Sequence, residues 1–355
     1  MQVKGYGPLT LIDGGGFSSV YKAENLSLHR SFAIKVLNPS AKSPESNVSS
    51  YREMQALSIA NHQNVVKLYE VVQCQSSVCL VMEYIPYTLS QVIQNFILPE
   101  SLIKGFMLML LRGLAHLHEL GIIHRDIKPQ NLLISSSGIL KICDLGLCRI
   151  LPEKIPAQSQ LNTSGNLNNI ANLNSSLNSN LNSMIVSPAS SVSSSTQDET
   201  HAWTLQVGTH YYRAPELLFG DRGYTEAIDI WAAGCVMAEL LNGEPLFPGV
   251  GDLELIGRIS ELLGSPSEET WPGISQMPDF GKLLFKERPR VDMRAKFPSW
   301  SNEALDLFEK FILYEPAKRI SAREALHHPW FNVEPTPTIA PYDSKSFNLF
   351  KAKSL

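Results

Sequence analysis

The hydrophobic pattern of the chain changes near residue 83, and this change restricts the folds open to it. Before that point the sequence favours one helix near 46–60 and short strands at 9–12, 20–24, 31–36, 66–72 and 78–82. Beyond a connector at 83–86, apolar residues recur every three or four positions in 101–120, 225–242, 252–263 and 302–313. A strand-rich part followed by a larger helical part predicts an α+β fold with two lobes.

Residues 124–131 form the most informative polar run, His-Arg-Asp-Ile-Lys-Pro-Gln-Asn. Asp126 can accept the proton of an attacking hydroxyl, and Lys128 can neutralise a terminal phosphate. Asn131, five residues beyond Asp126, can hold a magnesium ion. Because a His-Arg-Asp triplet also occurs by chance, the run predicts phosphoryl transfer only if its partners are present elsewhere in the chain.

Three further segments supply such partners. Lys35 follows the apolar pair at 33–34, as on a buried strand, and Glu53 lies on a segment with the pattern of an amphipathic helix. A strand lysine and a helix glutamate can form an ion pair, and Asp144 follows a strand pattern at 138–143. Taken singly, these residues are more simply a solvated lysine, a helix-face charge and a turn residue. Taken together, they predict a phosphoryl-transfer site.

Two runs nearer the C-terminus extend the set, Ala-Pro-Glu at 214–216 and Asp-Ile-Trp-Ala-Ala-Gly at 229–234. With them, the chain resembles the eukaryotic protein kinase family over about residues 5–332. Segments similar to the branch of cyclin-dependent and mitogen-activated kinases lie at 211–216, 245–249, 262–266, 271–273 and 316–322. Within that branch, residues 131–135, 137–138 and 241–243 are most similar to the cell-cycle-related kinases.

The resemblance implies a bilobal protein kinase fold, with a small β-rich N-lobe at 1–83, a larger helical C-lobe at 84–332 and a tail at 333–355. It also implies ATP and Mg²⁺ as cofactors. Asp126 would be the catalytic base, Lys128 would contact the γ-phosphate, and Thr209 would bridge the two. The implied magnesium ligands are Asn131 and Asp144, and the implied phosphate-orienting pair is Lys35 with Glu53. Two structural roles are implied as well, Asp229 holding the catalytic loop and Glu216 pairing with Arg319.

The same resemblance places an adenine site between the lobes. Met82 would be the gatekeeper, and Glu83 and Ile85 would supply backbone groups of the hinge. The apolar lining would consist of Ile12, Val20, Ala33 and Leu133. These apolar residues suit an ordinary protein core equally well, so only their positions relative to the motifs favour the adenine site.

The glycine-rich loop departs from the family pattern. Of the family's three glycines only the central one is kept, as Gly15, although Gly14 and Gly16 still permit close approach to phosphates. Asp13 adds a carboxylate that would repel a nucleotide, and Leu145 replaces the usual phenylalanine. These departures leave a second hypothesis open, a pseudokinase scaffold that binds partners without catalysis.

Regulation and substrate choice also follow from the resemblance. Thr204 matches the activating threonine of cyclin-dependent kinases, and its phosphate would be gathered by Arg52, Arg125 and Arg149. The simpler alternative is an ordinary loop hydroxyl. Lys128 is typical of Ser/Thr kinases. Arg213 favours proline-directed substrates, whereas Gly208 would make that preference looser because glycine is not held at positive φ.

Two segments are expected to lack regular structure. Residues of about 150–202 are rich in Ser and Asn, which predicts a disordered insertion inside the activation segment. A weak helix docking through its leucines is the alternative. The tail at 333–355 contains three prolines and is predicted to be a loosely packed extension.

Composition limits the remaining options. The formal net charge is −4, so nucleic acid is not an expected partner. Residues 1–11 lack the apolar core of a signal peptide, and the longest apolar stretch, 106–117, is too short for a membrane span. We therefore expect no membrane partner and a location in the cytoplasm, the nucleus or both. Expected partners are protein substrates, with a cyclin or another activator left open.

Overall fold

The computed structural model describes residues 2–14, 18–37, 44–74, 77–151, 210–340 and 351–352. Four residues of the predicted site, Gly15, Gly16, Thr204 and Thr209, lie outside these ranges, as does Gly208. The expected insertion also falls outside them from residue 152 onward.

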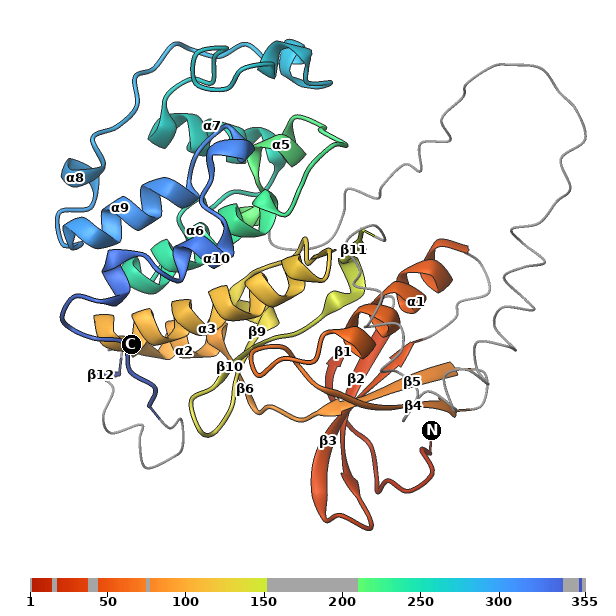
Figure 1. The fold of residues 1–355 in the computed structure, drawn as a ribbon. Coiled ribbons are helices and arrows are strands. Elements are labelled where there is room, and N and C mark those ends of the chain that lie inside the picture. The colour runs from red at the N-terminus through yellow and green to blue at the C-terminus, as the bar shows by residue number, and fades with distance from the viewer. Residues whose placement is uncertain are drawn as a thin grey trace, which may run out of the picture. The chain divides into compact units, whose positions relative to one another are not determined.

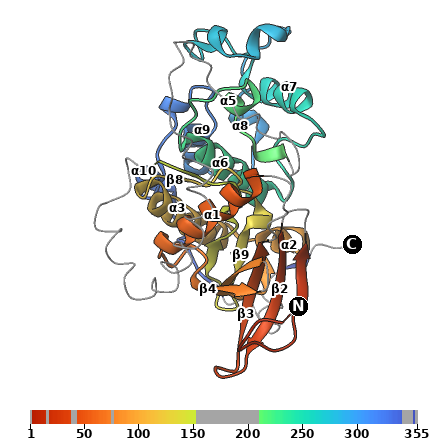
Figure 2. The ribbon, with the colours of Figure 1, turned by 90° about the vertical axis from the view of Figure 1, so that its right-hand side faces the viewer.

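The N-terminal part is a five-stranded antiparallel sheet with one helix beside it (Figures 1 and 2). The strands follow the order β1 (Thr10–Gly14), β2 (Ser18–Asn25), β3 (Arg30–Leu37), β5 (Ser77–Glu83) and β4 (Leu68–Cys74). The helix is α1 (Pro44–Ile59). All five expected strands and the expected helix are therefore confirmed, with ends that differ by a few residues.

Alternate side chains along a strand point to opposite faces of the sheet. The apolar side chains on one face form a core. This core contains Val3, Tyr6, Ala23, Phe32, Ile34, Val36, Cys74, Cys79 and Val81. Phe32 meets Tyr6 edge-on at a centroid distance of 5.8 Å, an arrangement that aromatic pairs prefer. In contrast, all five residues of β1 are exposed, which leaves this strand as an uncovered edge of the sheet.

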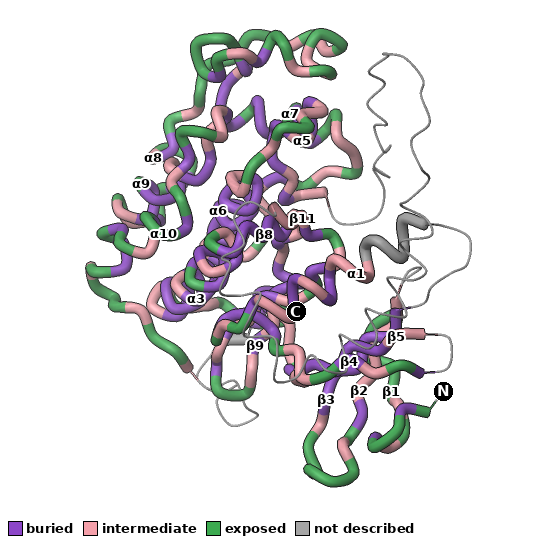
Figure 3. The backbone as a smooth tube through the Cα atoms, turned by 45° about the vertical axis from the view of Figure 1, so that its right-hand side comes forward, coloured by how far each residue is buried: buried purple, intermediate pink, exposed green. Residues whose placement is uncertain are grey.

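The C-terminal part is mainly helical. Its long helices are α3 (Glu100–Glu119), α6 (Ala227–Asn242), α7 (Asp252–Leu263) and α9 (Asn302–Phe311), so the four expected helices are confirmed. Shorter helices are α2 (Leu89–Asn95), α5 (Pro215–Leu218), α8 (Met293–Lys296) and α10 (Ala322–Ala325). Nearly every residue of α6 is buried, and Figure 3 shows it at the centre of this part. Among the described helices, none is long and apolar enough to cross a bilayer.

A small sheet carries the segments of the predicted site. Strand β9 (Leu132–Ile134) pairs antiparallel with β10 (Leu140–Ile142) on one side and with β6 (Tyr87–Thr88) on the other. A second pair joins β8 (Ile122–Ile123) to β11 (Arg149–Ile150). Because β9 starts directly after Asn131 and β10 ends two residues before Asp144, one hairpin connects both predicted metal ligands.

The tail contacts other parts of the chain. Residues 333–340 are exposed or half-buried, but they lie against α3, where the Thr338 backbone N–H donates to the Ser101 carbonyl at 2.9 Å. Farther along, β12 (Lys351–Ala352) pairs with β7 (Phe96–Ile97). The sequence did not indicate these contacts, because a proline-rich composition reports local conformation and not long-range backbone contacts.

Candidate active site

The loop at 124–131 is held by a buried carboxylate from α6. One oxygen of Asp229 accepts the His124 backbone N–H and the other accepts the Arg125 backbone N–H, each at 2.8 Å. Burial raises the pKa of Asp229, but the hydrogen bond to His118 and the nearby imidazoles outweigh it, so that the pKa falls below its ordinary value. Arg125 has φ of 71°, a strained value for a non-glycine residue, which these bonds stabilise. The predicted role of Asp229 is confirmed.

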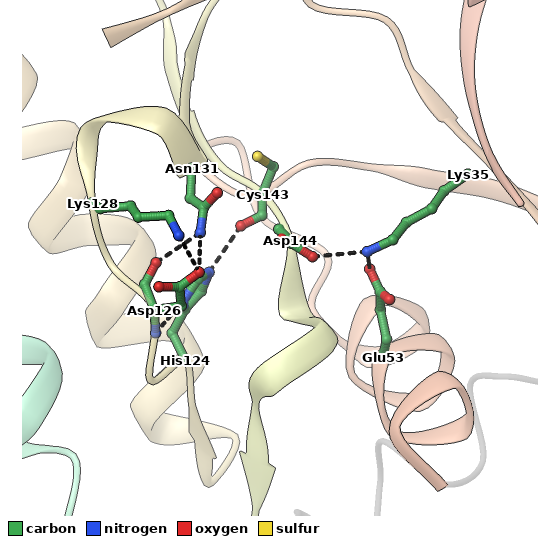
Figure 4. A network of polar contacts seen from close by, with 8 residues as sticks. All are labelled: Lys35, Glu53, His124, Asp126, Lys128, Asn131, Cys143 and Asp144. Atoms are coloured by element: carbon green, nitrogen blue, oxygen red, sulfur yellow. Dashed lines mark hydrogen bonds and ion pairs between the residues drawn. The ribbon is translucent and has the colours of Figure 1, made fainter. Parts of the chain in front are cut away.

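His124 links the two halves of the site. Its Nδ1 accepts the Asp126 backbone N–H at 3.2 Å, so its Nε2 carries the proton donated to the Cys143 carbonyl at 2.9 Å (Figure 4). The ring is fully buried. Sequence reasoning missed this role, although the position of His124 directly before Arg-Asp was the available signal.

Asp126 is the centre of a compact polar group (Figure 4). The Lys128 Nζ lies 2.8 Å from Asp126 Oδ2. The Asn131 Nδ2 donates to the same oxygen and to the Asp126 carbonyl, both at 2.8 Å. Since Asn131 uses its NH₂ group here, its amide oxygen is the atom left to act as a ligand.

Lys35 joins the other two predicted carboxylates. Its Nζ lies 2.6 Å from Glu53 Oε1 and 2.8 Å from Asp144 Oδ1. Burial opposes the ammonium charge, but these carboxylates outweigh it and raise the pKa of Lys35. Burial likewise opposes ionisation of Asp144, yet Lys35 lowers its pKa. For Glu53 burial raises the pKa above its ordinary value, although the ammonium of Lys35, 2.6 Å away, pulls it down.

Leu145 and Gly146 adjoin this cluster. Leu145 is fully buried, so the side chain that replaces phenylalanine packs inside the protein. A Cβ atom placed on Gly146 would lie 3.2 Å from Asp144 Oδ1 and 3.4 Å from Glu53 Oε2. Glycine therefore lets the chain pass close beside the ion pairs.

The predicted adenine residues come from several strands, Ile12 from β1, Val20 from β2, Ala33 from β3, Met82 from β5 and Leu133 from β9. Ala33 pairs with Met82 across β3 and β5, and Ala33, Met82 and Ile85 are buried. Val20 and Leu133 are half-buried, whereas Ile12 is 47% exposed and Gly14 is exposed with the rest of β1.

The side chain of Glu83 has a role that the sequence did not indicate. Its Oε1 accepts the Lys67 backbone N–H and contacts Lys141 Nζ, each at 2.7 Å. Because Lys141 belongs to β10, this contact ties the connector to the hairpin that precedes Asp144.

The three predicted phosphate-binding arginines lie close to one another. Arg52 donates to the Cys148 carbonyl at 3.2 Å, immediately before Arg149. The guanidinium groups of Arg125 and Arg149 lie over one ring, that of Tyr224, at 5.7 and 5.3 Å from its centroid. The Tyr224 hydroxyl also accepts from Arg125 Nη1 at 2.8 Å. Thr204, their predicted partner, lies outside the described residues.

Glu216 and Arg319 form the buried ion pair that the sequence predicted. Two parallel contacts join them, Nη1 to Oε1 at 2.7 Å and Nη2 to Oε2 at 2.8 Å, and both side chains are fully buried. Arg319 also donates to the carbonyls of Leu313 and Ala227. A bidentate pair with these additional bonds satisfies charges that would otherwise be costly to bury.

The donor set fits Mg²⁺ and the phosphates of ATP. The amide oxygen of Asn131 and the carboxylate of Asp144 are hard oxygen ligands of the kind that Mg²⁺ prefers. The Asp144 side chain is 46% exposed and can therefore be reached by a metal ion. Lys35 and Lys128 provide the cations that a triphosphate requires.

Comparison with known proteins identifies the class. A model of the protein kinase domain matches residues 6–167 and 189–331, so the chain belongs to the protein kinase family. The unmatched residues 168–188 fall within the predicted insertion. The predicted bilobal kinase fold is thereby confirmed, and ATP with Mg²⁺ are the cofactors of this family.

The relatives specify the branch. The chain is 38% identical to cyclin-dependent kinase 20 of Danio rerio over 335 residues, which cover 94% of this chain and 85% of that protein. It is 34% identical to the Homo sapiens protein of the same name, covering 92% and 82%. It is 33% identical to cyclin-dependent kinase 7 of Xenopus laevis, covering 95% and 84%. The predicted cyclin-dependent kinase branch is confirmed, and these comparisons do not support the pseudokinase alternative.

Proposed function

We propose that this kinase transfers the γ-phosphate of ATP to serine and threonine hydroxyls of protein substrates, with Asp126 as the base. The observation that carries the proposal is the shared Asp126 carboxylate, whose Oδ2 contacts both Lys128 and Asn131 at 2.8 Å. These contacts orient the carboxylate, and its second oxygen can accept the proton of the substrate hydroxyl. Thr209 would complete this group as the bridge between Asp126 and Lys128.

The phosphates would be aligned by the cluster of Lys35, Glu53 and Asp144. Glu53 contacts Lys35, and Lys35 in turn contacts Asp144, which supports a fixed ammonium beside the proposed metal ligand. When bound, Mg²⁺ supplies positive charge that neutralises the phosphates during transfer. Asn131 and Asp144 would hold that ion.

Adenine would bind between the lobes against the predicted apolar residues. Backbone groups of Glu83 and Ile85 would pair with the base, and Met82 would limit its depth. On this proposal Gly14, Gly15 and Gly16 cover the phosphates, and Ile12, Val20, Ala33 and Leu133 enclose the ring. The partial exposure of Ile12 is consistent with a position at the rim.

Substrate preference would depend on the segment after Thr209. Arg213 Nη1 lies 2.9 Å from Asp252 Oδ1, and His210 Nδ1 lies 3.1 Å from the same atom. This contact restrains Arg213, the residue that favours a proline after the phosphoacceptor. Gly208 would make the preference incomplete. A peptide array that varies the residue after Ser or Thr tests this, and equal phosphorylation with and without proline would contradict it.

Activation would proceed through phosphorylation of Thr204. The added charge would bind the arginines that Tyr224 already brings together, Arg125 and Arg149, with Arg52 nearby. We also propose a cyclin or another activator as partner and a location in the cytoplasm or nucleus, on the basis of the cyclin-dependent kinase relatives.

Transfer of labelled γ-phosphate to a generic basic protein tests the main proposal. Asp126→Asn should reduce transfer by at least about a hundredfold, because the base is lost while the side-chain shape is kept. Asp279→Asn is the matched control, since it makes the same chemical change at a partly exposed aspartate that pairs with Lys282 and is not one of the proposed site residues. Transfer by Asp126→Asn at the wild-type rate would contradict the proposal.

A further inference from the structure

The first eight residues of the tail make specific contacts with the start of α3. The Val333 carbonyl accepts Lys104 Nζ at 2.9 Å, and this lysine is fully buried, with Trp330 beneath it at 5.6 Å from the ring centroid. Five residues later, the Thr338 backbone N–H donates to the Ser101 carbonyl at 2.9 Å. The tail is therefore attached to α3 at two points.

Two glycines make the close approach of the tail possible. A Cβ atom placed on Gly105, inside α3, would overlap the Thr338 carbonyl oxygen. One placed on Gly138 would overlap the Ala340 carbonyl oxygen. Gly138 has φ of 82° and needs glycine for that reason alone. Gly105 has no such reason, and glycine inside a helix is unfavourable, so the crossing tail accounts for its presence.

Gly138 lies at the turn of the β9–β10 hairpin. Its N–H donates to the Ser135 carbonyl at 2.9 Å, and the strands pair from Leu140 with Ile134 to Ile142 with Leu132. The ladder continues to the Cys143 N–H, which donates to the Asn131 carbonyl at 2.9 Å. A displacement of the turn would therefore be passed along three residue pairs to the metal-binding end of the hairpin.

Helix α3 holds the other part of this hairpin. The Met109 sulfur accepts the Leu140 N–H at 3.3 Å, and a Cβ atom on Gly113 would lie 2.7 Å from Ile142 Cδ1. The strands of the hairpin thus pack on the middle of α3. The tail is attached to the start of the same helix and contacts the turn of the hairpin at Gly138.

We propose that residues 333–340 are a positioning element for Asn131 and Asp144, and that they act by fixing the turn at Gly138 relative to α3. The proposal rests on the proposed function only where it assigns Mg²⁺ to these two side chains. Its mechanical part, that the tail restrains the hairpin, is independent of catalysis.

The mechanical part is tested by hydrogen exchange of the amides at 132–142 in the full-length protein. Gly105→Ala should displace the tail and accelerate exchange there by about fivefold or more, because local opening becomes easier. A chain ending at Pro335 should do the same while keeping the Val333 partner of Lys104. The matched control is Gly257→Ala in α7, where an added Cβ meets nothing within 4 Å. Unchanged exchange in both test variants would overturn the proposal.

The sign of the stability change gives a second test. Alanine is favoured over glycine inside helices, so Gly257→Ala should raise Tm. Gly105→Ala should lower Tm in the full-length chain, where it collides with Thr338. It should raise Tm in the chain ending at Pro335, where that collision is absent. A rise in both backgrounds would show that the tail does not press on Gly105 and would overturn the proposal.

The link to the metal is tested by the Mg²⁺ concentration that gives half-maximal phosphate transfer. Gly105→Ala and the shortened chain should need about threefold more Mg²⁺ or more, because their ligands are less well positioned. If the amides of the hairpin exchange faster while the Mg²⁺ concentration for half-maximal transfer stays unchanged, the positioning role is overturned. If the wild-type enzyme transfers no phosphate at all, that result counts against the proposed function. The hydrogen-exchange and Tm measurements then still decide whether the tail restrains the hairpin.

Discussion

The Nε2 of His124 lies 2.9 Å from the Cys143 carbonyl and thereby joins the loop that carries Asp126 to the strand that leads to Asp144. The same ring accepts the Asp126 backbone N–H through Nδ1. One buried imidazole thus fixes the spacing between the proposed base and a proposed metal ligand. In this arrangement Nδ1 is the acceptor and Nε2 is the donor of the ring.

His124→Leu should therefore slow catalysis as well as destabilise the fold. It leaves the Asp126 N–H and the Cys143 carbonyl without their partner, at a cost of about 1–3 kcal/mol for each buried group. We expect kcat to fall by at least about tenfold at temperatures well below the new Tm. Steady-state kinetics and thermal unfolding measure the two effects.

His328→Leu is the matched control for this prediction. His328 is also buried, its Nδ1 accepts the Trp330 backbone N–H at 3.3 Å, and its Nε2 contacts Asp306. Because it lies outside the site, its loss should lower Tm but leave kcat nearly unchanged. Equal kcat values for the two variants would contradict the role of His124.

Removal of Lys35 separates stability from catalysis. Lys35→Met should destabilise the protein by about 3 kcal/mol, because Glu53 becomes an unpaired buried carboxylate. Adding Glu53→Gln removes that charge and should restore much of the stability. Phosphate transfer should remain lost in the double variant, since the ammonium is still missing. Urea unfolding and labelled phosphate transfer test the two halves, and recovery of transfer in the double variant would refute the role of Lys35.

Thr204→Ala should lower turnover by at least about tenfold, since a phosphate at this position would bind the clustered arginines. Thr163→Ala, in the Ser/Asn-rich segment, is the control and should have little effect. Both proteins should first be treated with an activating kinase, and phosphorylation should be verified by mass spectrometry. Wild-type turnover in Thr204→Ala would contradict activation at this residue.

The main strands and helices could be predicted because their signals are local. In β3 and α3 the spacing of apolar residues reports which face is buried, and the structure confirms both elements. Short elements carry too few residues for such a pattern. Helix α2 was not predicted, although Thr88 and Gln91 form a capping box at its start.

The candidate site divides in the same way. Lys35 and Glu53 could be paired from the sequence because a lysine on a strand and a glutamate on the following helix form a recognisable pair of motifs. The contact between Lys141 and Glu83 has no such motif, and neither has the crossing of Thr338 over Gly105. Contacts of this kind depend on how distant segments meet in space, which no local pattern encodes.

A stacked pair of imidazoles connects the segment after α1 to α3. The rings of His62 and His116 lie 4.9 Å apart. Burial lowers the pKa of both, and for His62 the charges of His116, Lys141 and Arg112 lower it further, against Glu119. His62 Nδ1 already accepts the Asn64 backbone N–H at 3.0 Å and so favours the unprotonated ring.

This pair predicts a loss of stability in mild acid. The ordinary pKa of histidine is about 6.5, and the pKa values of both rings in the folded protein lie below it. As the pH falls below about 6.5, the unfolded chain therefore binds more protons than the folded protein does, which favours unfolding. The contribution of these rings is therefore complete above about pH 6.5 and is lost as the pH decreases through the folded-state values. Urea unfolding at several pH values between about 5 and 8 measures this loss.

His116→Phe should reduce the acid dependence, because the new ring can still stack on His62 but cannot be protonated. Within the described residues His116 Nε2 is buried without a hydrogen-bond partner, so replacing it should cost little stability near neutral pH. His327→Gln, at an exposed position, is the control for loss of one imidazole and should keep the wild-type pH profile. An acid dependence in His116→Phe as steep as in the wild type would show that other groups cause it.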